Sequence, residues 1–144
     1  MGGIRDMRNI AIIDAQGAGL GQSIIKKIRK DIENDSITLI GLGTNNTATA
    51  NMIKAGADIG VTGEKRICDF LETENIWAVI GPIGVICNGG INGEITSEIS
   101  QKIFKLNCKK YIIPLKMHGI YVPGTVDLDI KDMIKEIIDD IKSN

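Results

Sequence analysis

The feature that most constrains the fold of this chain is an apolar run that ends in a glycine-rich turn and a helix. Residues 9–28 read Asn-Ile-Ala-Ile-Ile-Asp-Ala-Gln-Gly-Ala-Gly-Leu-Gly-Gln-Ser-Ile-Ile-Lys-Lys-Ile. Residues 10–14 predict a short buried strand, and the apolar residues of 20–34 recur at helical spacing. A strand, turn and helix in this order place free backbone N–H groups and the positive end of a helix at one point. Such a point suits an anion, for example a nucleotide phosphate.

The alternation of apolar runs and amphipathic helices continues along the chain. Further strands are predicted at 37–42, 57–61, 76–80 and 110–115, and further helices at 46–54, 63–74, 94–106 and 128–141. This pattern is typical of a parallel sheet covered by helices on both faces. We expect an α/β fold: a single-domain, doubly wound, Rossmann-like three-layer sandwich with about five parallel strands in the order 3-2-1-4-5. The alternative is the flavodoxin-like order 2-1-3-4-5. Residues 1–8 are expected to form an N-terminal extension, and residues 9–144 the Rossmann-like domain.

The bulk composition narrows the class of protein. A net charge of -1 gives no basic field for nucleic acid, and aromatic residues make up only 3%, too few for a base-stacking surface. No apolar run reaches the roughly 20 residues of a membrane span, and the N-terminus lacks the apolar core of a signal peptide. We expect a cytoplasmic protein with no nucleic-acid or membrane partner. Cys68, Cys87 and Cys108 form no metal-ligand pattern with the single histidine, His118, so no metal is expected.

The glycines of the first turn fit the spacing G-x-x-x-G-x-G, with Ala15 in the first position and Gly19 and Gly21 in the others. In such turns one glycine permits a positive φ, one lets phosphate approach the backbone, and one lets the helix pack close to the strand. The residues of this turn that we assign to cofactor binding are Asp14, Gln16, Gly17, Gly19, Leu20 and Gly21. Two alternatives stay open: Asp14 orders the loop by accepting backbone hydrogen bonds, or the turn binds nothing.

The end of the second predicted strand lacks the acidic residue that grips the adenosine ribose in many dinucleotide-binding domains. The sequence there is Gly-Leu-Gly-Thr-Asn-Asn-Thr, residues 41–47. We assign Thr44 and Asn45 to the ligand site as hydrogen-bonding groups, with capping of the next helix as the alternative. Because neither an acid nor an arginine lies here, the sequence favours neither NAD nor NADP.

A second glycine-rich segment, residues 80–94, follows the fourth predicted strand. In the order 3-2-1-4-5 this strand neighbours the first, so the two loops face each other across the crevice where such folds bind ligands. The residues of this loop assigned to the ligand site are Gly81, Pro82, Ile83, Gly84 and Asn88, and Asn92 and Glu94 are further polar candidates. The alternative is a long mobile loop in which Asn92 caps the following helix.

The helix at 63–74 begins at the same end of the predicted sheet. Thr62 is its expected N-cap, and Lys65 and Arg66 are candidates for a contact with phosphate.

Known sets of catalytic residues are not found in the sequence. A short-chain dehydrogenase needs Tyr-x-x-x-Lys, but the residues four positions after Tyr111 and Tyr121 are Leu115 and Thr125. No P-loop lysine follows the glycine turn, and no Ser-His-Asp set can be built around His118. The catalytic residues are therefore unassigned, and the sequence leaves open whether the chain is an enzyme.

Residues 9 to about 124 resemble a bacterial family of short Rossmann-like proteins that is catalogued as a domain of unknown function. The motifs that carry the resemblance are Ile-Asp-Ala-Gln-Gly-Ala-Gly-Leu-Gly at 13–21, Gly-Thr-Asn at 43–45, Ala-Gly-Ala at 55–57, Thr-Gly-Glu at 62–64, Gly-Pro-Ile-Gly at 81–84, Gly-Glu-Ile-Thr at 93–96 and Ile-Pro-Leu at 113–115. The family typically has glycine where this chain has Ala15. The resemblance implies the fold and a shared ligand cleft, and it implies no activity.

Three functions compete at this point. The first is a small protein that binds a nucleotide or phosphate ligand, of the NAD(P) type or an adenine nucleotide, without chemistry of its own. The second is a small oligomeric enzyme that acts on a nicotinamide cofactor or a phosphorylated metabolite. The third is a structural or partner-binding domain. Exposed sheet edges and the isoleucine-rich helix at 128–141 also point to a homodimer.

Overall fold

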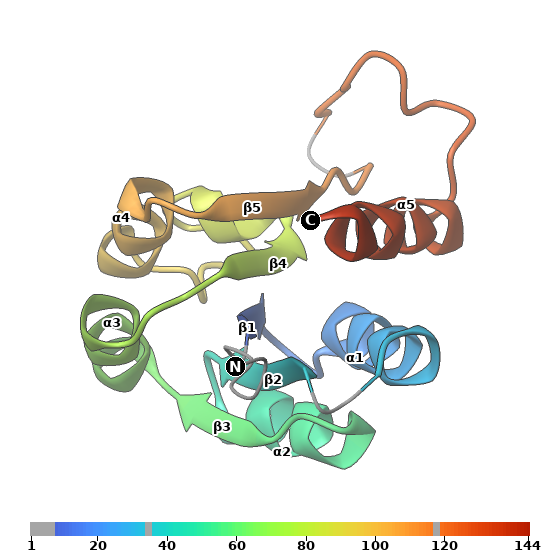
Figure 1. The fold of residues 1–144 in the computed structure, drawn as a ribbon. Coiled ribbons are helices and arrows are strands. Elements are labelled where there is room, and N and C mark those ends of the chain that lie inside the picture. Colours follow the sequence, from blue (N-terminus) through green and yellow to red (C-terminus); the bar gives the residue numbers. More distant parts are fainter. Residues whose placement is uncertain (1–7, 34–35, 117–118) are drawn as a thin grey trace.

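Five parallel strands form a single sheet in the order β3-β2-β1-β4-β5. The computed structural model describes residues 8–33, 36–116 and 119–144 (Figure 1). The strands are β1 (Arg8–Asp14), β2 (Ile37–Gly43), β3 (Ile59–Thr62), β4 (Ala78–Pro82) and β5 (Lys109–Ile113). Each neighbouring pair is parallel. The predicted order is confirmed, and the flavodoxin-like order is excluded.

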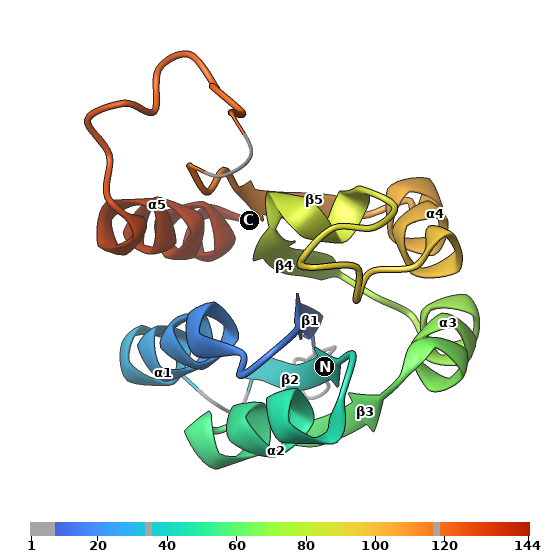
Figure 2. The same ribbon diagram turned by 180° about the vertical axis from the view of Figure 1, so that it is seen from behind.

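Helices cover both faces of the sheet, as Figures 1 and 2 show. They are α1 (Gly19–Asp31), α2 (Asn46–Ala55), α3 (Glu64–Thr73), α4 (Ser97–Lys105) and α5 (Ile130–Ser143), with a short 3-10 helix η2 (Ile83–Ile86) after β4. One apolar cluster joins the sheet to α1, α2 and α5, and a second joins it to α3, α4 and η2. The predicted three-layer α/β sandwich is confirmed. In the described ranges no helix is long and apolar enough to cross a bilayer.

The central strand β1 shows why the chain folds in three layers. Its side chains alternate between the two apolar clusters, with Ile10 and Ile12 in one and Ala11 and Ile13 in the other. All four are completely buried. The middle of a strand covered on both faces has no place for a polar side chain, so the polar residues of β1 stand at its two ends, and Asp14 is the one at the carboxyl end.

The helix boundaries show which local signals were read correctly. Asn45 caps α2 by accepting a hydrogen bond from the Ala48 amide (2.8 Å), and Gly56 ends the helix with a φ of 127°. By contrast, Thr62 does not cap α3, since its hydroxyl donates to Thr49 Oγ1 instead. The predicted helix at 94–106 begins later, at Ser97, because Thr96 rather than Asn92 accepts the capping hydrogen bond. The helix predicted over 20–34 ends earlier, at Asp31, because Ile32 is already extended, with a φ of -124°.

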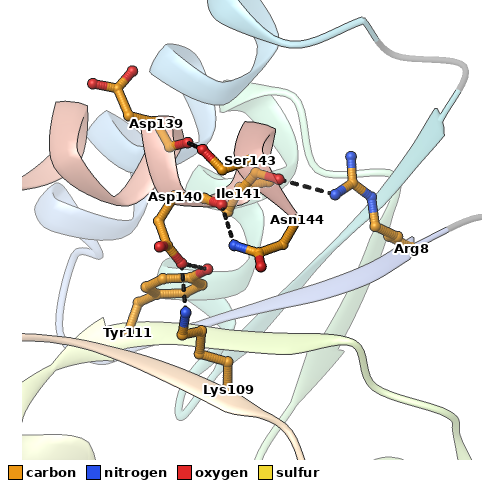
Figure 3. A network of polar contacts seen from close by, with 8 residues as sticks. All are labelled: Arg8, Lys109, Tyr111, Asp139, Asp140, Ile141, Ser143 and Asn144. Atoms are coloured by element: carbon orange, nitrogen blue, oxygen red, sulfur yellow. Dashed lines mark hydrogen bonds and ion pairs between the residues drawn. The ribbon is translucent and has the colours of Figure 1, made fainter.

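The C-terminal helix α5 is fixed to the sheet by polar contacts at its last turns (Figure 3). Asp140 Oδ2 accepts hydrogen bonds from Tyr111 Oη (2.5 Å) and Lys109 Nζ (2.7 Å), and Arg8 Nη1 donates to the Ile141 carbonyl (3.0 Å). Burial and the neighbouring Asp140 carboxylate raise the pKa of Tyr111, so the hydroxyl stays a donor. These contacts hold the ends of β5 and β1 against the helix.

The isoleucine face of α5 packs inside the chain. Ile134, Ile137, Ile138 and Ile141 are buried in the cluster shared with α1 and the sheet. This face is therefore not available to a second subunit, contrary to the reasoning from the sequence. The strands β3 and β5 form the two edges of the sheet, and whether they pair with a second subunit stays a prediction.

Gly43 offers a test of the packing between β2 and α2. A methyl group on Gly43 would lie 2.2 Å from Thr49 Oγ1 and 2.6 Å from the Thr49 backbone nitrogen. We expect Gly43→Ala to lower the free energy of unfolding by roughly 1–3 kcal/mol, because the backbone of α2 must shift. Urea unfolding followed by circular dichroism measures this change. The matched control is Gly17→Ala, where no atom lies within 4 Å of the new methyl group. Equal losses in the two variants would contradict the packing described.

Candidate functional site

A cavity of about 470 Å³ lies at the carboxyl ends of β1 and β4. The strand order reverses between these two strands, and open α/β sheets bind ligands at this point. The cavity walls are formed by the turn after β1 (14–20), by the segment after β4 (82–84 and 87–92), and by Leu115 and Ile120 after β5. Its volume falls within the range typical of small-molecule sites, about 300–1,000 Å³.

The Asp14 carboxylate shapes the turn after β1. Its Oδ1 accepts a hydrogen bond from the Ala15 amide and its Oδ2 accepts one from the Gly21 amide, both at 2.8 Å. Burial raises the pKa of Asp14 more than these two amides lower it, and the nearby Glu94 charge raises it further. The side chain therefore orders the loop, the alternative left open by the sequence, and it also borders the cavity.

Three amides of the turn have no hydrogen-bond partner within the described part of the chain. The Ala18 amide donates to the Ala15 carbonyl and the Gln16 amide donates to Glu94. The amides of Gly17, Gly19 and Leu20 are left, and these three residues line the cavity. They stand at the N-terminus of α1, where the helix dipole adds positive potential. This arrangement suits a negatively charged group of a ligand.

The glycines of the turn differ in part from their predicted roles. The positive φ angles fall on Gln16 (51°) and Ala18 (56°), and not on a glycine of this turn. Gly21 serves close packing, because a methyl group there would lie 2.9 Å from Met52 Sδ on α2 and 3.3 Å from Asp14 Cβ at the end of β1. Gly17 and Gly19 face open space, with no atom within 4 Å of an added methyl group. Their lack of side chains leaves room beside the free amides.

The loop after β4 places Glu94 against the loops after β1 and β2. Glu94 Oε1 accepts hydrogen bonds from Thr44 Oγ1 (2.6 Å), Asn45 Nδ2 (3.0 Å) and the Gln16 amide (3.1 Å). The Thr44 hydroxyl is the main cause that lowers the pKa of Glu94. An acidic group is therefore present at the end of β2, although the sequence around β2 has none. It comes from the opposite half of the domain.

The loop that carries Glu94 is held by its own backbone. The Gly89 amide donates to the Ile95 carbonyl (2.7 Å), and the Ile95 amide donates to the Gly90 carbonyl (3.1 Å). Ile91 and Asn92 adopt left-handed angles, with φ of 52° and 53°. Together with Gln16 and Ala18 they are the non-glycine residues of positive φ in the described ranges, so this kind of strain lies in the two loops that border the cavity. Such strain commonly marks functional sites.

Most of the residues predicted for the site surround the cavity. Asp14, Gln16, Gly17, Gly19, Leu20, Pro82, Ile83, Gly84 and Asn88 line it. Gly21, Gly81, Thr44 and Asn45 do not: the two glycines serve close packing, and the other two bind Glu94. Lys65 and Arg66 are exposed on α3 and are not among the lining residues.

Several residues of the cavity wall were not predicted. Leu115 and Ile120 lie after β5. The ends of β4 and β5 are adjacent, so the position of Leu115 and Ile120 after the last predicted strand could have indicated that they lie near the cavity. His118 lies outside the described residues. Within the part of the chain that the structure describes, no group of three or more potential metal ligands gathers in one place.

Comparison with known proteins identifies the family. Residues 9–144 match the family described as Domain of unknown function (DUF3842), and the chain belongs to this family. No curated protein matches the chain. The resemblance stated from the motifs is thereby confirmed.

Similar folds occur among solved structures. A universal stress protein from Archaeoglobus fulgidus is 12% identical with a TM-score of 0.42, covering 74% of this chain and 98% of that one. A dodecameric FMN-dependent Ubix-like decarboxylase from Escherichia coli O157:H7 is 10% identical with a TM-score of 0.49, covering 95% of this chain and 92% of that one. Levodione reductase is 12% identical with a TM-score of 0.38, covering 69% of this chain and 43% of that one. Likeness at these levels assigns no ligand.

The contacts of Glu94 predict a dependence of stability on pH. Because the folded chain lowers the pKa of Glu94 from 4.5, its ionised form stabilises the fold above that value, and this contribution is lost as the pH falls through the folded-state pKa. We expect Glu94→Gln to be less stable than the wild type at neutral pH, and the difference to shrink as the solution is acidified. Urea unfolding at a series of pH values measures it. The control is Glu136→Gln, an exposed acid on α5. A difference that grows on acidification would refute the assigned role.

Proposed function

We propose that this member of the DUF3842 family binds a small nucleotide or another phosphate-bearing ligand in the cavity between the loops after β1 and β4. The observation that carries the proposal is the row of unpaired amides at Gly17, Gly19 and Leu20, which borders the cavity at the N-terminus of α1. Amides in this position bind phosphate oxygens in many nucleotide-binding folds.

The charges around the cavity restrict the anionic group. No lysine or arginine is among the described lining residues, and the carboxylates of Asp14 and Glu94 lie nearby. Amide dipoles alone therefore face the ligand, and they must offset two negative charges. A ligand with a single anionic group fits this field better than one with several.

The rest of the cavity wall is largely apolar. Ile83, Ile91, Leu115 and Ile120 contribute to it, and Gln16, Asn88 and Asn92 add a few polar groups. A wall of this kind accommodates a planar ring or an aliphatic body and fixes its orientation with few hydrogen bonds. An NAD(P)-type cofactor and an adenine nucleotide are the candidates carried over from the sequence.

Binding, rather than catalysis, is the function that the described residues favour. Asp14 is the only carboxylate among the described lining residues, and both its oxygens are engaged by backbone amides. These two hydrogen bonds give the carboxylate a structural role in the turn. The enzymatic alternative has no comparable observation among the described residues in its favour.

Gly19→Val tests the ligand site directly. The new side chain would enter the open space beside the free amides, so we expect binding to weaken by about tenfold or more, equivalent to about 1.4 kcal/mol. Native mass spectrometry of freshly purified protein identifies any retained ligand. Calorimetry then measures the affinity of the wild type and of Gly19→Val for NAD(H), NADP(H), ATP, ADP, AMP, FMN and nicotinamide mononucleotide.

The control for this variant is Lys26→Ala, on the exposed side of α1. It should leave binding unchanged. Folded protein that retains no ligand and binds no member of the panel would refute the proposal for these compounds. If the wild type and Gly19→Val bind the same ligand with equal affinity, the ligand does not lie beside the amides of Gly17, Gly19 and Leu20.

A homodimer is a separate proposal that rests on the sheet edges. β3 and β5 each pair with one neighbour, and an edge strand is a template for pairing with another chain. Light scattering coupled to size exclusion would then give twice the mass of the chain, 15.6 kDa. A single-chain mass at the concentrations used for binding would refute the dimer.

A further inference from the structure

The cavity does not extend to the end of β2. Its described walls come from the segments after β1, β4 and β5, and neither Thr44 nor Asn45 is part of them. In dinucleotide-binding Rossmann domains the pyrophosphate lies at the N-terminus of the first helix, and the adenosine ribose lies at the end of the second strand. The first of these two places borders the cavity here, whereas the second lies outside it.

The hydrogen-bonding groups at the end of β2 are already in use. The Thr44 hydroxyl and the Asn45 amide group both donate to Glu94 Oε1, and Asn45 Nδ2 also lies 3.1 Å from the Gln16 carbonyl. Asn45 Oδ1 accepts from the Ala48 amide. An acid on β2 itself would accept hydrogen bonds from the ribose hydroxyls. Glu94 instead reaches this place from the loop after β4, and its Oε1 takes the donors of Thr44 and Asn45, so a ribose could gain them only by displacing the carboxylate.

Glu94 is anchored on both sides along the chain. Its own amide donates to the Ile91 carbonyl (3.1 Å). The next residue, Ile95, is completely buried and is tied to Gly89 and Gly90 by two backbone hydrogen bonds. Gly90 packs so closely against Gly84 that an added methyl group would lie 2.0 Å from the Gly84 carbonyl oxygen. Displacing the backbone at Glu94 therefore requires the whole loop to move.

We propose that Glu94 closes the adenosine side of the crevice, so that the ligand is the size of a mononucleotide: one anionic group at the amides of α1 and one ring system against Ile83, Leu115 and Ile120. Glu94 is then a specificity-determining residue that excludes the second nucleotide of a dinucleotide. This inference rests on the proposed function and narrows its ligand class. It sets the NAD(P)-type cofactor aside in favour of a compact ligand.

The negative charge of Glu94 also opposes the binding of a second nucleotide, as its bulk does. The donors around Oε1 lower the pKa of Glu94, so the group is an anion at neutral pH. A second phosphate, or a 2′-phosphate on a ribose at this place, would meet that charge without a nearby cation among the lining residues.

Matched pairs of ligands separate this inference from the proposed function. FMN and FAD, and likewise nicotinamide mononucleotide and NAD, share one head and differ by an AMP unit. By calorimetry we expect the wild type to bind the mononucleotide of at least one pair about tenfold more tightly than its dinucleotide. In Glu94→Ala, which frees Thr44 and Asn45, we expect that preference to fall toward unity.

The matched control is Glu94→Gln. Glutamine has the same length, and its oxygen accepts the same hydrogen bonds, so it keeps the bulk of Glu94 without its charge. The preference for the mononucleotide should therefore fall only in part, and less than in Glu94→Ala. Unfolding midpoints show that both variants are folded; if Glu94→Ala is not, Thr44→Val tests the same contact by removing the shortest hydrogen bond to Glu94.

Each outcome decides one of the two statements. If the wild type binds a dinucleotide more tightly than its mononucleotide, the size limit is wrong while the proposed function stands. If Glu94→Ala keeps the preference of the wild type, Glu94 is not its cause and the inference fails. If neither pair nor ADP binds to folded protein, the proposed function fails for nucleotides, and the size limit fails with it.

Discussion

The Asp14 carboxylate is the contact on which the geometry of the site depends. The middle of β1 is apolar and buried on both faces, so after Asn9 the next polar side chain is Asp14, at the carboxyl end of the strand. There the Asp14 carboxylate accepts hydrogen bonds from the amides of Ala15 and Gly21 and so connects the two ends of the turn. With those amides engaged, the ones left over are in the middle of the turn, at Gly17, Gly19 and Leu20. The candidate anion site is thus a consequence of how a buried carboxylate is satisfied.

Asp14 and Glu94 show how two neighbouring carboxylates take opposite pKa shifts. Asp14 is almost fully buried, and loss of solvation outweighs its two amide donors. Glu94 stands closer to solvent, so its donors, led by the Thr44 hydroxyl, outweigh burial. Each carboxylate uses chain donors that a ligand would otherwise meet. Among the described residues, the turn amides left without a partner consequently lie on the α1 side of the crevice, the side on which the proposed ligand would be held.

The sequence predicted the parts of the structure that depend on local periodicity. The strand order, the Asn45 cap and the end of α2 at Gly56 follow from apolar spacing and capping chemistry. The left-handed angles at Gln16 and Ala18 did not follow, because tertiary contacts impose them on residues that carry no such signal. The bond from Thr44 to Glu94 joins residues 50 positions apart, and no local pattern encodes it. Leu115 and Ile120 were missed because strand ends, and not motifs, bring them to the cavity.

Glu94 comes from the loop after β4, and it therefore links this loop to β1 and β2 in a way that an acid on β2 would not. An acid on β2 would hold its place whatever the loop after β4 did. Here the acid reaches the end of β2 from that loop, and it bonds to the turn after β1 on the way, through the Gln16 amide. The three loops are therefore joined through one side chain. A ligand that enlarges the crevice toward β2 must break three hydrogen bonds on Glu94 Oε1, whereas a ligand confined to the cavity breaks none of them. Ligand size and loop geometry are coupled through this one oxygen atom.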